Sequence, residues 1–177
     1  MENLRRVFLV GYMGSGKSTI GKHLAADMGW QFVDMDEVFE KQHNTTISDF
    51  FATNGEEAFR KAEAEIVSQM CEEQNVVIAT GGGAPCHFDN VERMRNAGLV
   101  IYIYVEPVVL ARRLQNARAS RPLLANKTVQ ELEAHIAAQL AERDKFYRQA
   151  QMTVDGDRLP FSAYKMFVDA FEQSNTL

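Results

Sequence analysis

The stretch Gly11–Thr19 reads GYMGSGKST and contains the pattern Gly-x-x-x-x-Gly-Lys-Ser. An apolar run, Val7–Val10, precedes it, and a stretch with the features of a helix, Lys17–Met28, follows it. In a strand–loop–helix unit of this kind, the backbone N–H groups of the loop and the N-terminus of the helix surround phosphate oxygens. The stretch therefore predicts a binding site for the phosphates of a nucleotide.

The side chains of this loop predict the chemistry of the site. Lys17 has the position of a lysine that reaches the β- and γ-phosphates, and Ser18 has the position of a Mg²⁺ ligand. The residues expected to contact the nucleotide are Gly14, Ser15, Gly16, Lys17, Ser18 and Thr19. The loop alone does not distinguish a kinase from a motor or a switch. A GTP switch would need an Asn-Lys-x-Asp segment, and Asn126–Val129 lacks the aspartate.

Short apolar runs alternate with helical stretches along the rest of the chain. The predicted strands are Val7–Val10, Phe32–Asp34, Val76–Ala79, Leu99–Val105 and Met152–Val154. The predicted helices are Lys17–Met28, a short insert within Thr45–Gly55, Glu56–Glu73, a stretch from a Thr128–Glu131 capping box to about Ala150, and Ser162–Phe171. This alternation is typical of a buried parallel sheet flanked by helices, and 177 residues fit one domain, residues 1–177.

The composition excludes several classes of function. A net charge of -5 argues against a protein that binds nucleic acid through a broad basic surface. The sequence contains no apolar run long enough to span a membrane, so we expect no membrane insertion. The two cysteines, Cys71 and Cys86, are too few for a disulfide framework and indicate reduced thiols in the cytoplasm.

Two carboxylates, Asp34 and Asp36, follow the second predicted strand. Side chains at positions i and i+2 of a strand point to the same face, so both carboxylates are expected at one site. In open α/β sheets this site lies beyond the carboxyl ends of the strands, where the phosphate loop also lies. One carboxylate would support the metal ion, and the other would accept a proton from an attacking hydroxyl.

Six segments occur in a fixed order: GYMGSGKST, Asp34-x-Asp36, Phe59-Arg60-x-x-Glu63, Thr80-Gly-Gly-Gly83, Arg121-Pro-Leu-Leu124 and Arg143-x-x-x-Tyr147. Together they resemble the shikimate kinases over nearly the whole chain. The resemblance implies transfer of a phosphoryl group from ATP, with Mg²⁺, to the 3-hydroxyl of shikimate. It also implies a P-loop kinase fold of the nucleoside-monophosphate-kinase type. In that fold a five-stranded parallel sheet lies between helices, and an acceptor-binding insert (about 36–63) and a mobile lid (about 115–127) are added.

The resemblance assigns the acceptor side residue by residue. It implies that Asp36 binds the shikimate hydroxyls and is the candidate base, and that Asp34 positions Mg²⁺. It implies that Arg60 and Arg143 hold the carboxylate, for which a guanidinium fork has matching geometry. The other residues that it places at the acceptor are Gly81, Gly82, Gly83, Phe51 and Phe59.

Further residues are placed near the nucleotide by the same resemblance. Arg121 would lie on the lid and stabilise the transferring phosphoryl group. Arg113 would stack on adenine, with Arg112 and Arg118 as alternatives for this contact. One departure is that the family's Arg-x-Pro-Leu-Tyr segment reads Arg143-Asp-Lys-Phe-Tyr147 here, without the proline.

Two other functions are compatible with parts of this sequence. A gluconate or nucleoside-monophosphate kinase of the same fold would explain the phosphate loop and the lid arginines, but explains the Asp34/Asp36, Arg60 and triple-glycine combination less well. A regulatory nucleotide-binding module without catalysis would be expected to lack Lys17, Asp34 or Arg121, and all three are present. Because no coiled-coil seam is found and the family is commonly monomeric, we expect a monomer.

Overall fold

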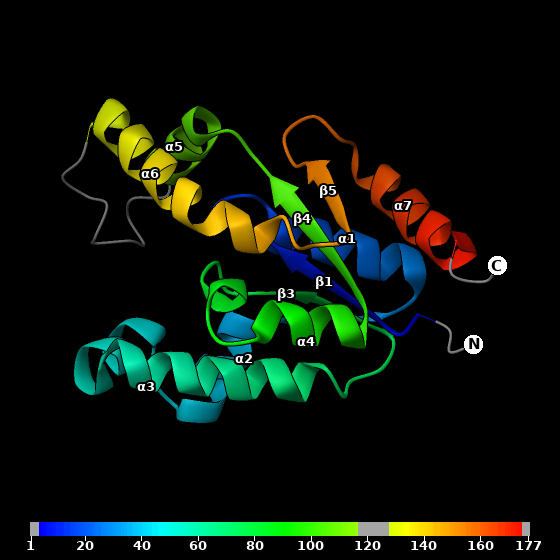
Figure 1. The fold of residues 1–177 in the computed structure, drawn as a ribbon, viewed down its shortest axis with the longest axis horizontal. Helices are drawn as coiled ribbons and strands as arrows, with labels where there is room; N and C mark the ends of the chain where they lie inside the picture. The colour runs from blue at the N-terminus through cyan, green and yellow to red at the C-terminus, as the bar shows by residue number, and fades with distance from the viewer. Residues whose placement is uncertain (1–3, 117–127, 175–177) are drawn as a thin grey trace.

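The computed structural model describes residues 4–116 and 128–174. These residues contain a five-stranded sheet in which all neighbouring strands are parallel, in the order β2-β3-β1-β4-β5 (Figure 1). The strands are β1 (Arg6–Val10), β2 (Gln31–Asp34), β3 (Val76–Ala79), β4 (Leu99–Tyr104) and β5 (Met152–Asp155). The predicted five-stranded parallel sheet is confirmed.

Helices connect the strands and cover both faces of the sheet (Figure 1). They are α1 (Lys17–Met28), α2 (Met35–His43), α3 (Ile47–Met70), α4 (Asn90–Ala97), α5 (Pro107–Asn116), α6 (Val129–Tyr147) and α7 (Phe161–Ser174), with a short 3₁₀ turn, η1 (Ala84–Cys86). A parallel sheet covered on both faces needs strands that are apolar at every position. This explains why Val7–Val10 and Val76–Ala79 are continuous apolar runs.

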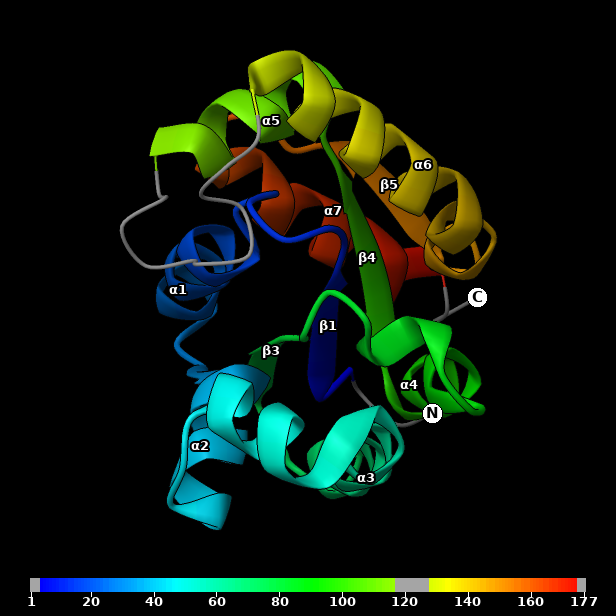
Figure 2. The ribbon, with the colours of Figure 1, turned by 90° about the vertical axis from the view of Figure 1, so that its left-hand side faces the viewer.

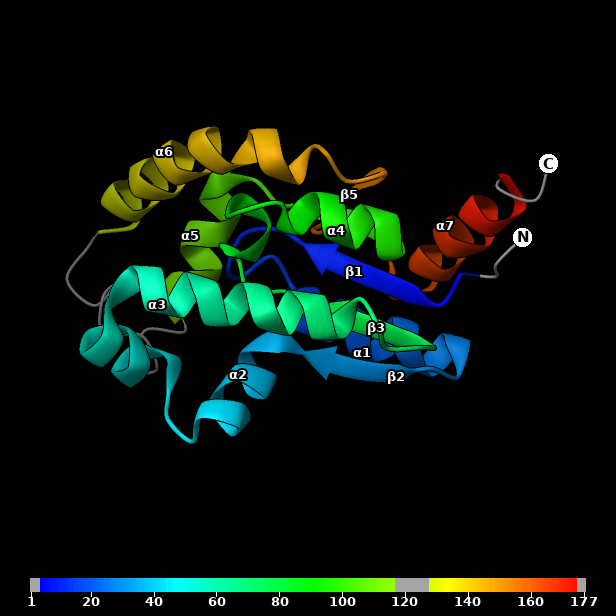
Figure 3. The same ribbon diagram turned by 60° about the horizontal axis from the view of Figure 1, so that its bottom comes forward.

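Alternate strand residues point into two separate cores. Phe8 of β1 faces the core that α3, α5 and α6 cover, whereas the adjacent Leu9 faces the core that α1 and α7 cover. Figure 3 shows α3 and α4 side by side on one face of the sheet. The result is a three-layer sandwich of helix, sheet and helix.

The carboxyl ends of the strands define the edge where the predicted site residues gather. Figure 2 looks onto this edge and shows α1, α2, α3, α5 and α6 arranged around it. The phosphate loop joins β1 to α1 at this edge, and the glycine triplet follows β3 there. Because the strands are parallel, segments that are far apart in sequence meet at one place.

Some elements differ from the sequence predictions. Helices α2, α4 and α5 were not predicted; α2 and α4 have only nine and eight residues, too few for a clear apolar repeat. The predicted insert and the helix after it form one element, α3, with a break at Gly55, where φ is 80° and ψ is 174°. The other predicted helices and strands end within three residues of their observed bounds.

Among the described residues, no helix combines the length and the apolar character that crossing a membrane would require.

Candidate active site

The phosphate loop follows β1 directly and passes into α1 at Lys17. Gly16 caps the helix with a φ of 97°, a left-handed conformation that residues with a Cβ rarely adopt. The buried Lys17 ammonium donates hydrogen bonds to the carbonyl oxygens of Gly11 (2.8 Å) and Tyr12 (3.0 Å). The side chain therefore lies over the loop, beside the helix N-terminus that favours anions.

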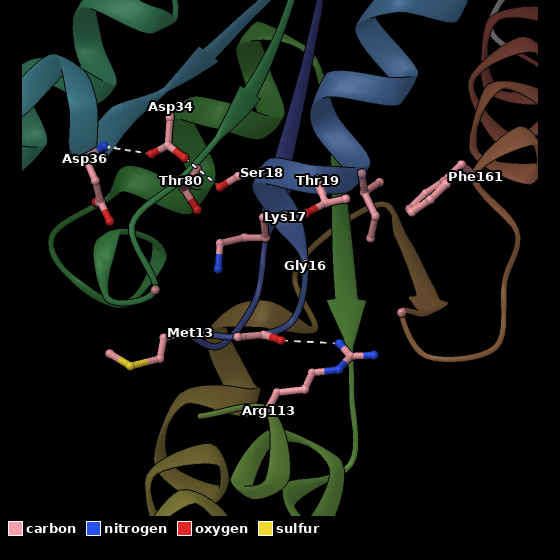
Figure 4. Close-up of a pocket in the computed structure, with 14 residues that line it drawn as sticks. Met13, Gly16, Lys17, Ser18, Thr19, Asp34, Asp36, Thr80, Arg113 and Phe161 are labelled. Atoms are coloured by element: carbon pink, nitrogen blue, oxygen red, sulfur yellow. Dashed lines mark hydrogen bonds between the residues drawn. The ribbon is translucent and has the colours of Figure 1, made fainter. Parts of the chain in front are cut away.

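A cavity of about 520 Å³ opens beside this loop (Figure 4). Nine of the residues predicted to bind nucleotide, metal or acceptor line it: Gly14, Gly16, Lys17, Ser18, Thr19, Asp34, Asp36, Gly82 and Arg113. Ser15 lies in the loop but is almost fully buried. The cavity thus brings together residues from α1, β2, α2, α5 and the loop after β3.

Asp34 and Asp36 reach the cavity for a different reason from the one the sequence suggested. Asp34 ends β2 and caps α2, whereas Asp36 belongs to the first turn of that helix. The expectation that both project from one strand is therefore wrong. The Asp34 carboxylate accepts a hydrogen bond from the Asp36 backbone N–H (3.1 Å), and this cap turns the chain so that both side chains line the cavity.

Two oxygen ligands lie together at the phosphate loop. The Ser18 hydroxyl donates a hydrogen bond to the other Asp34 carboxylate oxygen at 2.6 Å (Figure 4). Among the described residues, no group of three His, Cys, Asp or Glu side chains could hold a metal ion. A hydroxyl and one carboxylate suit Mg²⁺, which keeps several waters and takes further oxygens from phosphates.

The opposite end of the cavity is bordered by Arg113, Gly156 and Phe161. The Arg113 guanidinium donates to the Asp157 carboxylate (2.7 Å) and to the Gly14 carbonyl oxygen (3.3 Å), so the phosphate loop and the segment between β5 and α7 hold it. Phe161 is 42% exposed and stacks on His23, with ring centroids 4.1 Å apart. This end offers a flat guanidinium and an aromatic face, both of which bind a planar base.

Of the three arginines considered for the adenine contact, only Arg113 lies in the described cavity wall. Arg112 is exposed on the same helix, and Arg118 lies outside the described residues. Arg121 and most of the predicted lid (about 115–127) also lie outside them, so the role of Arg121 stays a prediction.

A cluster of charged side chains lies next to Asp36 and the glycine triplet, although its members Arg60 and Glu63 do not themselves line the cavity. Arg60 donates to Glu63 at 2.8 Å and also pairs with Glu56 at 3.4 Å. Glu63 is buried, and this burial raises the pKa of its carboxyl group, although the positive charge of Arg60 opposes the effect. The nearby Asp36 carboxylate raises the same pKa further.

The glycine triplet fits tightly against this cluster. A Cβ at Gly83 would lie 2.6 Å from an Arg60 nitrogen, and a Cβ at Gly81 would lie 2.7 Å from a Glu63 oxygen. Gly82 lies against the phosphate loop, where a Cβ would be 3.3 Å from the Met13 backbone nitrogen. The triplet therefore lies between the acceptor cluster and the phosphate loop, at positions that a side chain would fill.

The second predicted carboxylate ligand, Arg143, comes from α6 and joins the same region. Its guanidinium carbon lies 5.4 Å from the centre of the Tyr12 ring. Four residues further on, the Tyr147 hydroxyl donates to the Gly82 carbonyl oxygen at 2.5 Å. Burial raises the pKa of Tyr147 well above its usual value, so this hydroxyl keeps its proton.

The two predicted aromatic residues lie together but in different environments. The rings of Phe51 and Phe59 are 5.7 Å apart between centroids. Phe59 is buried in the core against Phe39, and the Arg60 guanidinium lies 4.9 Å from its ring centre. Phe51 is 39% exposed. Phe59 thus supports Arg60 from the core, and Phe51 borders the solvent.

Several residues at the site were not assigned a role from the sequence. Phe161, Tyr12 and Gln139 are the main ones, and each depends on partners far along the chain. Tyr12 is the second residue of the phosphate loop, but Gln139, which accepts the hydrogen bond from its hydroxyl, is 127 positions away on α6. No local pattern in the sequence predicts such a pair.

Comparison with known proteins agrees with this geometry. The sequence profile of the shikimate kinase family matches residues 13–170. A protein named shikimate kinase from Parabacteroides distasonis is 44% identical over 156 residues, which cover 88% of this chain and 90% of that protein.

Solved structures give the same result. The shikimate kinase from Bacteroides thetaiotaomicron, at 38% identity, superposes with a TM-score of 0.86 over 98% of this chain and 99% of that one. The shikimate kinase from Acinetobacter baumannii in complex with shikimate, at 32% identity, gives a TM-score of 0.84 over 98% and 96% of the two chains. These matches, together with the phosphate loop and the acceptor cluster, show that the chain belongs to the shikimate kinase family.

Proposed function

We propose that the protein transfers the γ-phosphoryl group of ATP to the 3-hydroxyl of shikimate, giving shikimate 3-phosphate. The observation that carries this proposal is the meeting of two different sites at one cavity. The phosphate loop lines much of the cavity, and Asp36 and Gly82 line its acceptor end. Behind this end lies the cluster of Arg60, Glu63 and the glycine triplet. The similarity to a shikimate kinase solved in complex with shikimate supports the choice of acceptor.

On the nucleotide side, ATP lies along the cavity with its phosphates in the loop and its adenine near Arg113 and Phe161. The Lys17 ammonium exchanges its two carbonyl contacts for oxygens of the β- and γ-phosphates. The backbone N–H groups of Gly14 to Thr19 hold the same phosphates at the helix N-terminus.

Ser18 and Asp34 would hold Mg²⁺, since their oxygens lie 2.6 Å apart at the phosphate loop. When bound, the ion neutralises the charge that develops on the transferring phosphoryl group.

On the acceptor side, Arg60 and Arg143 hold the shikimate carboxylate, because a planar guanidinium matches two carboxylate oxygens. Asp36 binds the ring hydroxyls, and Gly81, Gly82 and Gly83 let the acceptor approach the backbone closely. Phe51 forms the exposed part of the apolar wall, and Phe59 supports it from the core. The position of Asp36 in the cavity wall, in the first turn of α2, supports its role as the group that accepts the hydroxyl proton.

The pH dependence of kcat separates the two roles open to Asp36. A general base gives the rate an acidic limb that Asp36→Asn removes, along with most of kcat. A carboxylate that only orients the hydroxyl leaves the shape of the profile unchanged in that variant.

We infer that the protein acts as a monomer in the cytoplasm and without nucleic acid. The net charge of -5 supports the inference that the protein does not bind nucleic acid, and the two free thiols, Cys71 and Cys86, support the cytoplasm. Analytical ultracentrifugation at micromolar concentration should give the molar mass of one chain, 20.0 kDa.

A coupled assay of ADP release tests the proposed function. Shikimate, gluconate and nucleoside monophosphates are each offered with ATP and Mg²⁺. We expect turnover with shikimate and none above background with the other acceptors. Turnover with gluconate or a nucleoside monophosphate, and none with shikimate, would contradict the proposal.

A further inference from the structure

Helix α6 presents one stripe of side chains to the active site. Gln139, Arg143 and Tyr147 are spaced by four residues, so they lie on the same face of the helix. Each contacts a segment that the function uses: Gln139 and Arg143 contact the phosphate loop, and Tyr147 contacts the glycine triplet. The stripe therefore joins the nucleotide side and the acceptor side.

Tyr12 is the residue of the phosphate loop that meets this stripe. It is only 5% exposed, its hydroxyl donates to the Gln139 side-chain oxygen, and its ring lies against Arg143. The Arg143 guanidinium carbon is 5.4 Å from the ring centre, within the range of a cation–π contact. Burial raises the pKa of Tyr12, so the phenol stays protonated and remains a donor to Gln139.

The other end of the stripe holds the acceptor loop. The Tyr147 hydroxyl donates to the Gly82 carbonyl oxygen, and Gly82 itself lies close to the backbone of Met13 and Gly11. The phosphate loop, the glycine triplet and α6 thus contact one another pairwise, with Arg143 in the middle of the stripe. A change in how Tyr12 packs is expected to reach Arg143 directly.

We propose that Tyr12 is a positioning residue for the acceptor, although it belongs to the nucleotide loop: its ring holds the Arg143 guanidinium in the orientation that binds the shikimate carboxylate. This inference rests on the proposed function, in which Arg143 binds that carboxylate. An arginine side chain has many rotamers, and its ordering lowers the affinity for a ligand. A guanidinium that already rests on an aromatic face loses less freedom when the carboxylate arrives.

Replacing the ring tests the inference. Tyr12→Leu keeps an apolar side chain but removes the aromatic face, so we expect the KM for shikimate to rise about 10-fold. We expect kcat at saturating shikimate and the Kd for ADP to change by less than about 3-fold, because the backbone of the loop still binds the phosphates. Tyr12→Phe keeps the face and loses only the contact to Gln139, so its KM should stay within about 3-fold of the wild-type value.

Phe146→Leu is the matched control. Phe146 also carries a cation over its ring, the Lys145 ammonium at 5.0 Å, and it lies on the same helix near Arg143. Among the described residues, Phe146 makes no hydrogen bond and no ring contact with the phosphate loop or the glycine triplet. The KM of Phe146→Leu for shikimate should therefore equal that of the wild-type protein. An unchanged KM in Tyr12→Leu, or an equal rise in Tyr12→Phe, would overturn the inference.

A measurement without substrate separates this inference from the proposed function. A guanidinium over the face of an aromatic ring is shielded by the ring current, so we expect the Nε–H NMR signal of Arg143 to move downfield in Tyr12→Leu and to stay in place in Tyr12→Phe. An unmoved signal in Tyr12→Leu would refute the contact, whatever the acceptor is. If the wild-type protein does not phosphorylate shikimate, the proposed function fails, and the signal still decides whether Tyr12 orients Arg143. Circular dichroism melting curves establish that each variant is folded.

Discussion

The two sides of the cavity are built in different ways. The nucleotide side uses one unbroken stretch, Gly11–Thr19, whose backbone and helix N-terminus do most of the binding. The acceptor side uses side chains from α2, α3, α6 and the loop after β3, which pair with one another over long distances in sequence. The first side depends on local conformation and the second on tertiary packing, so their variants should fail in different ways.

The largest effect is expected on the nucleotide side, from Lys17→Ala. This change removes the only side-chain cation that the loop offers to the phosphates, and kcat should fall by at least about 10³-fold, or several kcal/mol in the transition state. Steady-state ADP release at saturating ATP and shikimate measures it. The KM for shikimate should change little, because Lys17 lies on the loop and not in the acceptor cluster.

Lys22→Ala is the control for this variant. Lys22 lies on the same helix, but it is exposed and contacts the Phe32 ring outside the cavity. Its kcat should match that of the wild-type protein. A Lys17→Ala variant with a kcat near the wild-type value would overturn the mechanism on this side of the cavity.

Variants on the acceptor side should change mainly the KM for shikimate. Arg60→Ala removes one of the two guanidinium forks and leaves the buried Glu63 without its partner at 2.8 Å. We expect the KM for shikimate to rise by about 10²-fold, which is the loss of about 2–3 kcal/mol of charged hydrogen bonding. The Kd for ADP, measured by calorimetry, should stay within about 2-fold.

The neighbouring Lys61 provides a control of equal charge. Lys61 is 62% exposed and pairs with Glu57 on the outer face of α3, so Lys61→Ala should leave the KM for shikimate unchanged. If Arg60→Ala behaved like Lys61→Ala, Arg60 would not bind the carboxylate, and the acceptor side would need a different assignment.

The contrast between local conformation and tertiary packing also explains which features could be predicted from the sequence. The phosphate loop, the sheet and α1 follow from local patterns, since glycine spacing and apolar runs act over a few residues. The location of Asp34 and Asp36 was right for a wrong reason, because a nine-residue helix starts between them. Apart from the Asp34/Asp36 pair, the acceptor residues were proposed only through the resemblance to a family. No spacing rule relates Arg60 to Gly83 or Tyr12 to Gln139, and these pairs exist only once the parallel strands bring the loops together.

A smaller effect is expected where the glycine triplet meets the arginine. The Cβ of Gly83→Ala would lie 2.6 Å and 2.9 Å from the two terminal nitrogens of Arg60, so the guanidinium must move away. A displaced fork keeps part of its attraction for a carboxylate, and we expect a rise of about 10-fold in the KM for shikimate, less than for Arg60→Ala.

Gly29→Ala separates this effect from simple destabilisation. Gly29 ends α1 with a φ of 66°, and a Cβ there would meet nothing within 4 Å. This variant should lose about 1 kcal/mol of stability through backbone strain and keep the KM of the wild-type protein. Equal KM values for Gly83→Ala and Gly29→Ala would show that the triplet does not control the position of Arg60.

The smallest effect concerns the buried carboxylate of Glu63. Because burial raises its pKa above the usual value of 4.5, the folded protein binds this proton more tightly than the unfolded chain does. The free energy of unfolding should therefore fall as the pH rises from about 4.5 through the raised pKa, and Glu63 contributes most to stability below that window.

Glu63→Gln isolates this contribution. The amide oxygen can still accept the hydrogen bond from Arg60, but the group no longer titrates. Urea unfolding at several pH values from about 4.5 upward should give a free energy of unfolding that declines more steeply for the wild-type protein than for the variant. A difference of opposite sign would mean that the attraction of Arg60 exceeds the effect of burial. Glu63 and Arg60 would then form a stable ion pair. The acceptor side would resemble the nucleotide side, because its charged groups would be held in place before the substrate binds.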